Sequence, residues 1–327
     1  MKRREFLCTS GAALLLSTVR SHAQQLGRTY RIGVLGAGRV HNFVIGIPPM
    51  LDELRKAGFA PGSNLVYVER HIAADGSNAV AMARELVAAG AELIVAVGPE
   101  TTARAALEAR PQGPVVMLAN HLDIVEKGYA KSLARPGGSV TGINTLMKPL
   151  AGKQLELLAE AFPARQRIGI LSDHHTTEQL DIVRELAKEM RLEMVSHVFE
   201  KEPYDWEAGF NRLVVEGAQS VFVNSSTSFT PHQRVITKLA LRHRLPSMFI
   251  FPLYVDAGGL MSYTYDVPDI YRRLGYFAGR VLAGTPVGEL PIEQPRQFFF
   301  TLNLKTAAAL GVELPTSILL RADRVIE

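Results

Sequence analysis

Polar side chains collect where predicted buried strands give way to helices. Thr101 and Thr102 follow one such strand, and their hydroxyls and backbone N–H groups could hold a carboxylate at the positive end of the helix that begins there. Asp123 and Asp173 follow other strands and could hold an ammonium group. Residues 224–228, Asn-Ser-Ser-Thr-Ser, add a dense set of donors and acceptors. The pattern predicts contacts to a small polar ligand, although threonine and aspartate at such positions equally suit helix capping.

Four histidines, His41, His121, His174 and His175, also fall at predicted strand ends. If they converge in one cleft, their imidazoles could bind zinc or nickel. The sequence supports none of them with a His-x-x-x-His pair on a helix or with a cysteine ligand. We therefore predict no metal site, and an exported enzyme with a histidine-lined cleft stands as an alternative.

The first predicted strand runs into Gly36-Ala37-Gly38, which resembles the start of a dinucleotide-binding fingerprint. His41 stands where the third glycine of that motif allows a helix to pack closely on a strand. Glu69, the candidate ribose-binding acid, lies 33 residues beyond Gly36 instead of about 20. The sequence also contains no nucleophile elbow, P-loop or zinc-protease motif. These observations predict no cofactor and no catalytic residue.

Short apolar runs alternate with amphipathic segments along the chain. Pro48 and Pro49 predict that the first helix starts at Met50, because proline in a first turn loses no helical hydrogen bond. Strands that are apolar throughout and separated by helices predict parallel sheets covered on both faces. The predicted strands are 30–35, 65–71, 93–97, 115–119, 167–171, 193–198, 220–223 and 248–251, and the predicted helices are 50–58, 79–89, 101–110, 152–161, 178–190, 206–216 and 232–243.

The two halves of the chain resemble each other. The sequence RIGVL at residues 31–35 recurs as RIGIL at residues 167–171, and the alternation of strands and helices repeats after it. The length of 327 residues, 47% of them hydrophobic, is enough for two buried cores. Segments rich in glycine and proline, at 135–144, 256–259 and 284–291, predict a chain that passes between two α/β lobes more than once and so forms a hinge.

The first 23 residues have the layout of an export signal. Lys2, Arg3 and Arg4 precede a short apolar stretch at 11–19, and Ser-His-Ala at 21–23 places small residues at −3 and −1 of a cleavage point. RREFL at residues 3–7 resembles the twin-arginine export motif. Cys8, the one cysteine, precedes the apolar stretch, which argues against a lipoprotein signal and leaves the mature chain without disulfides. Removal of this segment lowers the formal charge from +4 to about +1, so nucleic acid is not expected as a partner.

Residues 133–142 read LARPGGSVTG, and four more segments follow in order: RHRLP at 242–246, AGGLMSY at 257–263, NLKTA at 303–307 and LRADRVIE at 320–327. The first resembles the Leu-Ala-Arg-Pro-Gly-Gly-Asn-x-Thr-Gly signature of a bacterial family of ABC-transporter substrate-binding proteins, which includes tryptophan- and tyrosine-binding members. The other four segments resemble the same family. The resemblance extends over essentially the whole mature chain.

This resemblance implies a type I periplasmic binding fold, in which two α/β lobes with doubly wound parallel sheets are joined by three crossovers and close around a ligand. The implied lobes are 28–144 plus 258–284 and 145–257 plus 285–327. The ligand-binding positions carried over from the family are Thr101, Thr102, Asn120, Asp173, Asn224 and Ser225, and we expect Tyr254 in an apolar or aromatic wall of the site.

The family resemblance also implies a function. The chain is similar to members whose ligands are amino acids, so we expect a monomeric periplasmic binding protein that is not an enzyme. Its expected partners are a small-molecule ligand and an ABC permease in the inner membrane, and a ligand-sensing role beside a membrane receptor is an alternative. Thr264 replaces a glycine of the family, and the loops at 36–41 and 120–123 are unlike those of relatives. These loops would select the ligand.

Overall fold

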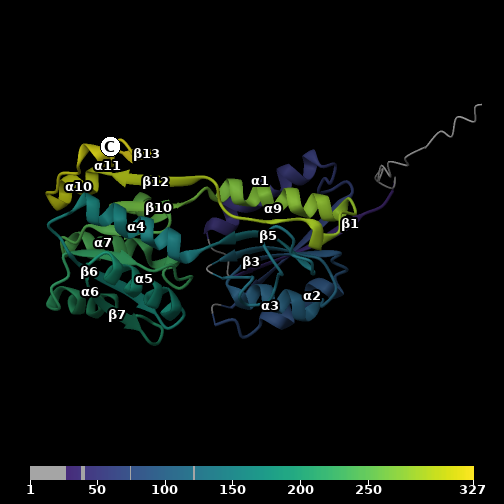
Figure 1. The fold of residues 1–327 in the computed structure, drawn as a ribbon, viewed down its shortest axis with the longest axis horizontal. Coiled ribbons are helices and arrows are strands. Elements are labelled where there is room, and N and C mark those ends of the chain that lie inside the picture. The colour runs from purple at the N-terminus through teal and green to yellow at the C-terminus, as the bar shows by residue number, and fades with distance from the viewer. Residues whose placement is uncertain (1–26, 38–40, 74, 121) are drawn as a thin grey trace, which may run out of the picture.

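The computed structural model describes residues 27–37, 41–73, 75–120 and 122–327, without the side chains of residues 37 and 41–44. Within these residues the chain forms two sheets, each covered by helices, which lie side by side as two lobes (Figure 1). The fold predicted from the sequence, two mainly parallel α/β lobes, is confirmed. The predicted signal at residues 1–23 lies outside the described residues.

The first sheet has the strand order β11-β5-β4-β3-β1-β2, and every pairing in it is parallel. One apolar cluster packs helices α1 and α9 against one face, and a second packs α2 and α3 against the other. The strands are β1 (Tyr30–Ala37), β2 (Leu65–Ile72), β3 (Leu93–Gly98), β4 (Val115–Asn120), β5 (Val140–Thr145) and β11 (Ile292–Glu293), and the helices are α1 (His41–Lys56), α2 (Ala79–Ala88), α3 (Glu100–Ala109), α9 (Val267–Leu282) and the 3-10 helix η2 (Val287–Glu289).

The second sheet has the order β13-β12-β10-β9-β8-β6-β7, parallel except for the pair β10–β12. Apolar clusters again cover both faces, with α4, α5, α10 and α11 on one and α6, α7 and α8 on the other. The strands are β6 (Arg167–Asp173), β7 (Glu193–Phe199), β8 (Ser220–Val223), β9 (Ser247–Phe249), β10 (Met261–Tyr265), β12 (Phe298–Asn303) and β13 (Arg324–Ile326). The helices are α4 (Met147–Ala161), α5 (Thr177–Glu189), α6 (Trp206–Val215), η1 (Thr230–His232), α7 (Gln233–Arg242), α8 (Pro252–Asp256), α10 (Leu304–Leu310) and α11 (Thr316–Leu319).

Three crossovers join the lobes, as the glycine- and proline-rich segments predict, but at other positions. The chain crosses at Leu146 between β5 and α4, at Asp266 between β10 and α9, and at residues 294–297 between β11 and β12. The second and third crossovers are tied together, because the backbone N–H of Asp266 donates to the carbonyl of Gln297 at 3.0 Å.

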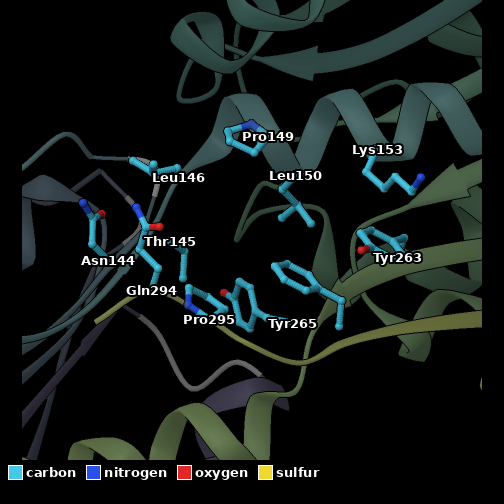
Figure 2. Close-up of a pocket in the computed structure, with 11 residues that line it drawn as sticks. Asn144, Thr145, Leu146, Pro149, Leu150, Lys153, Tyr263, Tyr265, Gln294 and Pro295 are labelled. Carbon is cyan, nitrogen blue, oxygen red and sulfur yellow. The ribbon is translucent and has the colours of Figure 1, made fainter. Parts of the chain in front are cut away.

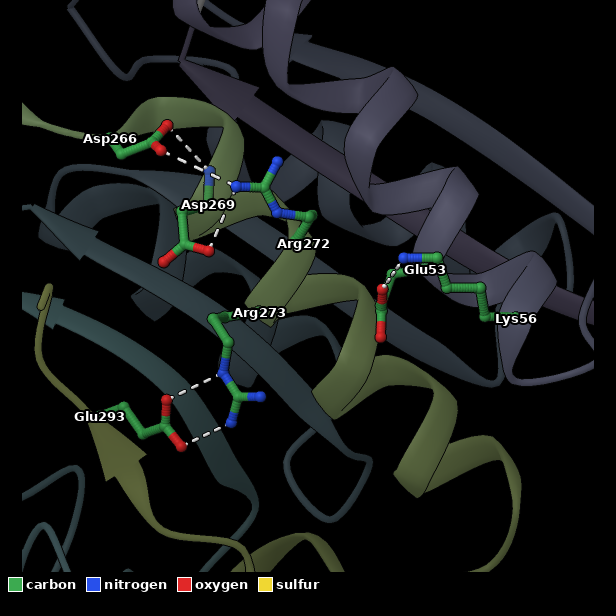
Figure 3. Close-up of polar contacts among 7 residues, drawn as sticks. All are labelled: Glu53, Lys56, Asp266, Asp269, Arg272, Arg273 and Glu293. Atoms are coloured by element: carbon green, nitrogen blue, oxygen red, sulfur yellow. Dashed lines mark hydrogen bonds and ion pairs between the residues drawn. The ribbon is translucent and has the colours of Figure 1, made fainter. Parts of the chain in front are cut away.

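Charged side chains hold the second and third crossovers to the first lobe (Figure 3). The Asp266 carboxylate caps α9 by accepting from the Asp269 N–H at 3.1 Å, and Arg272 lies within ion-pair distance of both carboxylates. Arg273, the next residue of α9, donates two hydrogen bonds to Glu293 of β11, at 2.9 and 2.6 Å. The second crossover therefore ends, and the third begins, at a residue held on the first lobe.

Two segments lie in a different lobe from the one that the sequence analysis predicted for them. β10 pairs with β9 and β12 in the second sheet, although residues 258–265 fall in the predicted first lobe. β11 pairs with β5 in the first sheet, although residues 285–293 fall in the predicted second lobe. In both segments a short strand pairs with one sheet, and this pairing sets the lobe to which the segment belongs. The glycine content of a segment does not predict which sheet its strand joins.

Two local predictions are wrong. Helix α1 begins at His41, and Pro48 and Pro49 lie inside it. An interior proline costs about 3 kcal/mol. Helix α1 packs closely on α9, where a Cβ on Gly46 would lie 2.4 Å from the Tyr271 ring. Residues 140–145, predicted as a connection, form the buried strand β5. Gly142 there has φ +134° and lies so close to the backbone of Met117 that no side chain fits.

Candidate functional site

Strands β4 and β10 belong to different lobes, and their last residues are in contact, because the Tyr265 hydroxyl donates to Asn120 Oδ1 at 3.3 Å. The loop after β2 contains Asp75, whose pKa is lowered mainly by hydrogen bonds from the backbone and hydroxyl of Ser77. The charge of His175, in the loop after β6 of the other lobe, adds the smallest lowering. This weak effect across the lobes is consistent with loops that face each other beside the contact between Asn120 and Tyr265.

Asp173, the last residue of β6, is fully buried, and its carboxylate has four donors within its own lobe. The Thr176 hydroxyl donates at 3.0 Å, the His175 N–H at 3.1 Å and the Tyr204 hydroxyl at 3.1 Å, and the Ser226 hydroxyl donates as well. Burial, followed by the charge of Asp173, raises the pKa of Tyr204 far above its usual value, so this hydroxyl stays protonated. Asp173 therefore holds together the loops after β6 and β8, and a contact to a ligand ammonium stays a prediction.

Asn224 directly follows β8 and is 2% exposed. Its Nδ2 donates to the Ser172 hydroxyl at 2.6 Å, which orients the amide and leaves Oδ1 free to accept. Among the described residues, this buried Oδ1 has no hydrogen-bond partner. Gln179 of α5 fixes the adjacent Ser225 by accepting from its N–H and donating to its carbonyl, both at 3.1 Å.

Thr101 and Thr102 lie in the first turn of α3, whose N-cap is Pro99. Neither threonine is the cap, so the alternative explanation of these residues by N-capping does not hold. Thr102 is fully buried, and its hydroxyl is likewise without a partner in the described part of the chain. Thr101 is half-buried beside Gly76 of the loop after β2.

Asn120, at the end of β4, joins the site to the hinge. Its Oδ1 accepts from the Tyr265 hydroxyl of β10 at 3.3 Å and from the Thr145 hydroxyl at 3.2 Å. Tyr254, in contrast, is 3% exposed and stacks on Phe249 with ring centroids 4.7 Å apart. The ring of Tyr254 thus belongs to the core beneath the loop after β8, and its place in a ligand wall stays a prediction.

The histidines do not form a cluster in the described residues. His174 and His175 are exposed, with ring centroids 3.7 Å apart, whereas His121 and the side chain of His41 lie outside the described residues. Nowhere in the described ranges do three or more His, Cys, Asp or Glu side chains gather as metal ligands. Asp123 caps its own turn by accepting from the N–H groups of Val125 and Glu126.

Two residues of the site were missed by the sequence analysis. Tyr204 reaches Asp173 from 31 positions away, and Gln179 reaches Ser225 from 46 positions away. Tyr204 lies in the loop before α6, and Gln179 lies on the first turn of α5, which the sequence marks only as the start of a helix. Neither residue has a local sequence signal that predicts its contact.

The geometry agrees with comparisons to known proteins. The family described as "ABC transporter substrate binding protein" matches residues 44–326. The chain belongs to this family. A relative from Clostridioides difficile, named tyrosine-binding protein, is 26% identical over 283 residues, which cover 81% of this chain and 78% of that protein.

Solved structures of other proteins show the same fold. An ABC domain from Streptococcus pneumoniae in complex with L-Trp has a TM-score of 0.80 at 22% identity, and a conserved domain protein from Vibrio cholerae has a TM-score of 0.82 at 20% identity. In both cases the alignment covers 91% of this chain and 100% of the other. Among the described residues of this family member, no helix is both long and apolar enough to span a bilayer.

Proposed function

We propose that this substrate-binding protein is exported to the periplasm, captures an amino acid between its lobes and delivers it to an ABC permease in the inner membrane. Tyrosine and tryptophan are the first candidates. The name of the C. difficile relative and the L-Trp complex of the S. pneumoniae relative support an aromatic amino acid. The basic and apolar N-terminal segment supports export, with RREFL favouring the twin-arginine route.

The observation that carries this proposal is a pair of buried oxygen atoms, one in each lobe. The Thr102 hydroxyl lies in the first turn of α3, in the first lobe, and Asn224 Oδ1 lies directly after β8, in the second lobe. Neither atom has a hydrogen-bond partner among the described residues. A buried polar atom left unpaired costs about 1–3 kcal/mol. Because Asn224 Oδ1 can only accept, a ligand ammonium suits it, and a ligand that satisfies both atoms stabilises an arrangement in which the lobes are close.

The proposed mechanism is closure of the lobes about the three crossovers. The lobes that we propose to close are 28–145 with 267–293 and 147–265 with 298–327, as the sheet pairings divide the chain. The ligand contacts both lobes only in the closed state, so binding shifts the equilibrium toward that state. No bond of the ligand changes in this cycle, and the ligand is released unchanged.

Calorimetric titration tests the function. The purified protein is unfolded and refolded to remove any ligand carried through purification, and is then titrated with each of the twenty L-amino acids. We expect one-to-one binding of L-tyrosine or L-tryptophan, and weaker binding of phenylalanine or none. Absence of binding for all twenty would overturn an amino-acid ligand.

A further inference from the structure

The three crossovers border a cavity of about 310 Å³ that lies beside the hinge (Figure 2). Leu146 and Leu150 at the start of α4, Tyr265 of β10 and Phe298 of β12 are among the residues that line it. Ligand pockets measure about 300–1,000 Å³, and an engineered cavity of about 150 Å³ holds benzene. The hinge cavity is therefore large enough for a molecule of one or two rings.

The lining decides what kind of molecule fits. Lys153 alone is charged among the described residues of the lining, and its Nζ is paired with Glu156 at 2.6 Å. A paired lysine offers little to a free carboxylate, and the lining contains no acidic side chain for an ammonium group. Leucine, proline, phenylalanine and tyrosine supply most of the rest. An uncharged aromatic molecule matches this surface, whereas a zwitterionic amino acid does not.

The cavity and the candidate site share a wall. Tyr265 and Thr145 both line the cavity, and their hydroxyls are the two groups that contact Asn120 Oδ1. Tyr265 is 4% exposed, and it belongs to the second sheet while Asn120 belongs to the first. A molecule packed against the Tyr265 ring would hold this cross-lobe contact in place and keep the Asn120 side chain in one orientation.

We propose that the hinge cavity is a second binding site, for a small uncharged aromatic molecule, and that its occupation strengthens binding in the cleft through Tyr265 and Asn120. The second half of this proposal rests on the proposed function, and the first half does not. Coupling of this kind is reciprocal, so the cleft ligand strengthens binding in the cavity by the same factor.

Indole is the probe for the cavity, with binding followed by ligand-observed NMR. We expect saturable binding to the wild-type protein and its loss in Leu146→Trp, whose larger side chain fills the cavity. Leu320→Trp makes the same exchange at a residue 82% exposed and outside the lining, and should bind indole like the wild type. Circular dichroism checks that both variants are folded. Equal indole binding by a folded Leu146→Trp protein, or no binding by the wild type, would overturn the site.

Titration of L-tyrosine with and without saturating indole tests the coupling. We expect about fivefold tighter L-tyrosine binding with indole present, the lower end of common allosteric effects, and no change in Tyr265→Phe, which lacks the hydroxyl. Mutually exclusive binding would mean that both probes use one site, and an unchanged L-tyrosine affinity would overturn the coupling. If L-tyrosine does not bind at all, the proposed function fails for this ligand, while the indole titrations still decide the cavity.

Discussion

A single amide at the end of β8 carries much of the argument for ligand binding. Asn224→Ala removes a buried amide oxygen that has no partner among the described residues, together with the bond to Ser172. A hydrogen bond to a charged group contributes about 1.5–3 kcal/mol, so L-tyrosine affinity should fall by roughly ten- to a hundredfold. Isothermal titration calorimetry on the purified variant measures this loss.

Ser220, at the other end of the same strand, provides the matched control. Its hydroxyl is also buried and also lacks a partner in the described part of the chain, but it lies at the amino end of β8, away from the candidate site. Ser220→Ala should therefore leave L-tyrosine affinity within twofold of the wild type. Equal effects of the two substitutions would mean that Asn224 acts through the stability of the strand and not through the ligand.

Sequence reasoning could place these residues but not pair them. Strand-end positions follow from the apolar runs, and they placed Asp173, Asn224 and Thr102 at or just after the carboxyl ends of strands, as the structure has them. Two of the four partners of Asp173 come from other loops, 31 and 53 positions away in the sequence. Such contacts depend on how the loops fold over one another, which strand periodicity does not contain.

At the level of elements, strand β7 and helix α6 pack around His197. The imidazole lies against the Phe199 ring, with centroids 4.6 Å apart, and over Gly209 of α6. Burial, followed by the positive charge of Arg212, lowers the pKa of His197 below its usual 6.5, and Glu216, Asp205 and Glu200 counteract this only in part. The unfolded chain thus binds this proton at a higher pH than the folded chain does.

This difference predicts that stability falls as the pH drops through 6.5 and levels off below the lowered pKa of the folded state. In His197→Gln this contribution is absent, so the decrease in melting temperature between pH 7.5 and pH 5 should be smaller than in the wild type. Circular dichroism melts across this range measure both slopes. Parallel curves for the two proteins would show that His197 does not titrate in this way.

The elements themselves were predicted to different degrees. Strand β8 lies at the predicted residues, 220–223, because a short apolar run bounded by polar residues has few other solutions. Strand β5 was missed because Gly142, Asn144 and two threonines make it look like a loop, and its burial comes from the neighbouring β4 and β11. Helix α9 was also missed, although its buried residues recur at helical spacing and Asp266 caps its start.

On the scale of the whole molecule, the third crossover starts from an anchored residue and then passes between two cavities. Arg273 and Glu293 anchor the third crossover on the first lobe. Gln294 and Pro295 of that crossover line the apolar hinge cavity and also a second, charged cavity of about 270 Å³. With space on both sides, this segment can change its backbone angles without a clash, as a hinge must. Closure about it would bring the loop after β2 nearer to the loop after β6.

Cross-linking across these two loops tests that motion. In a Cys8→Ser background the chain has no other cysteine, so Asp75→Cys with His175→Cys presents one thiol on each lobe. L-tyrosine should increase the rate at which a short bismaleimide joins the two, because the closed state brings them together. Arg84→Cys with Glu108→Cys is the control, since that pair, an ion pair at 3.3 Å in the native chain, joins α2 to α3 within the first lobe and should react at one rate throughout. An unchanged rate at positions 75 and 175, with L-tyrosine bound by calorimetry, would mean that the ligand is held without closure.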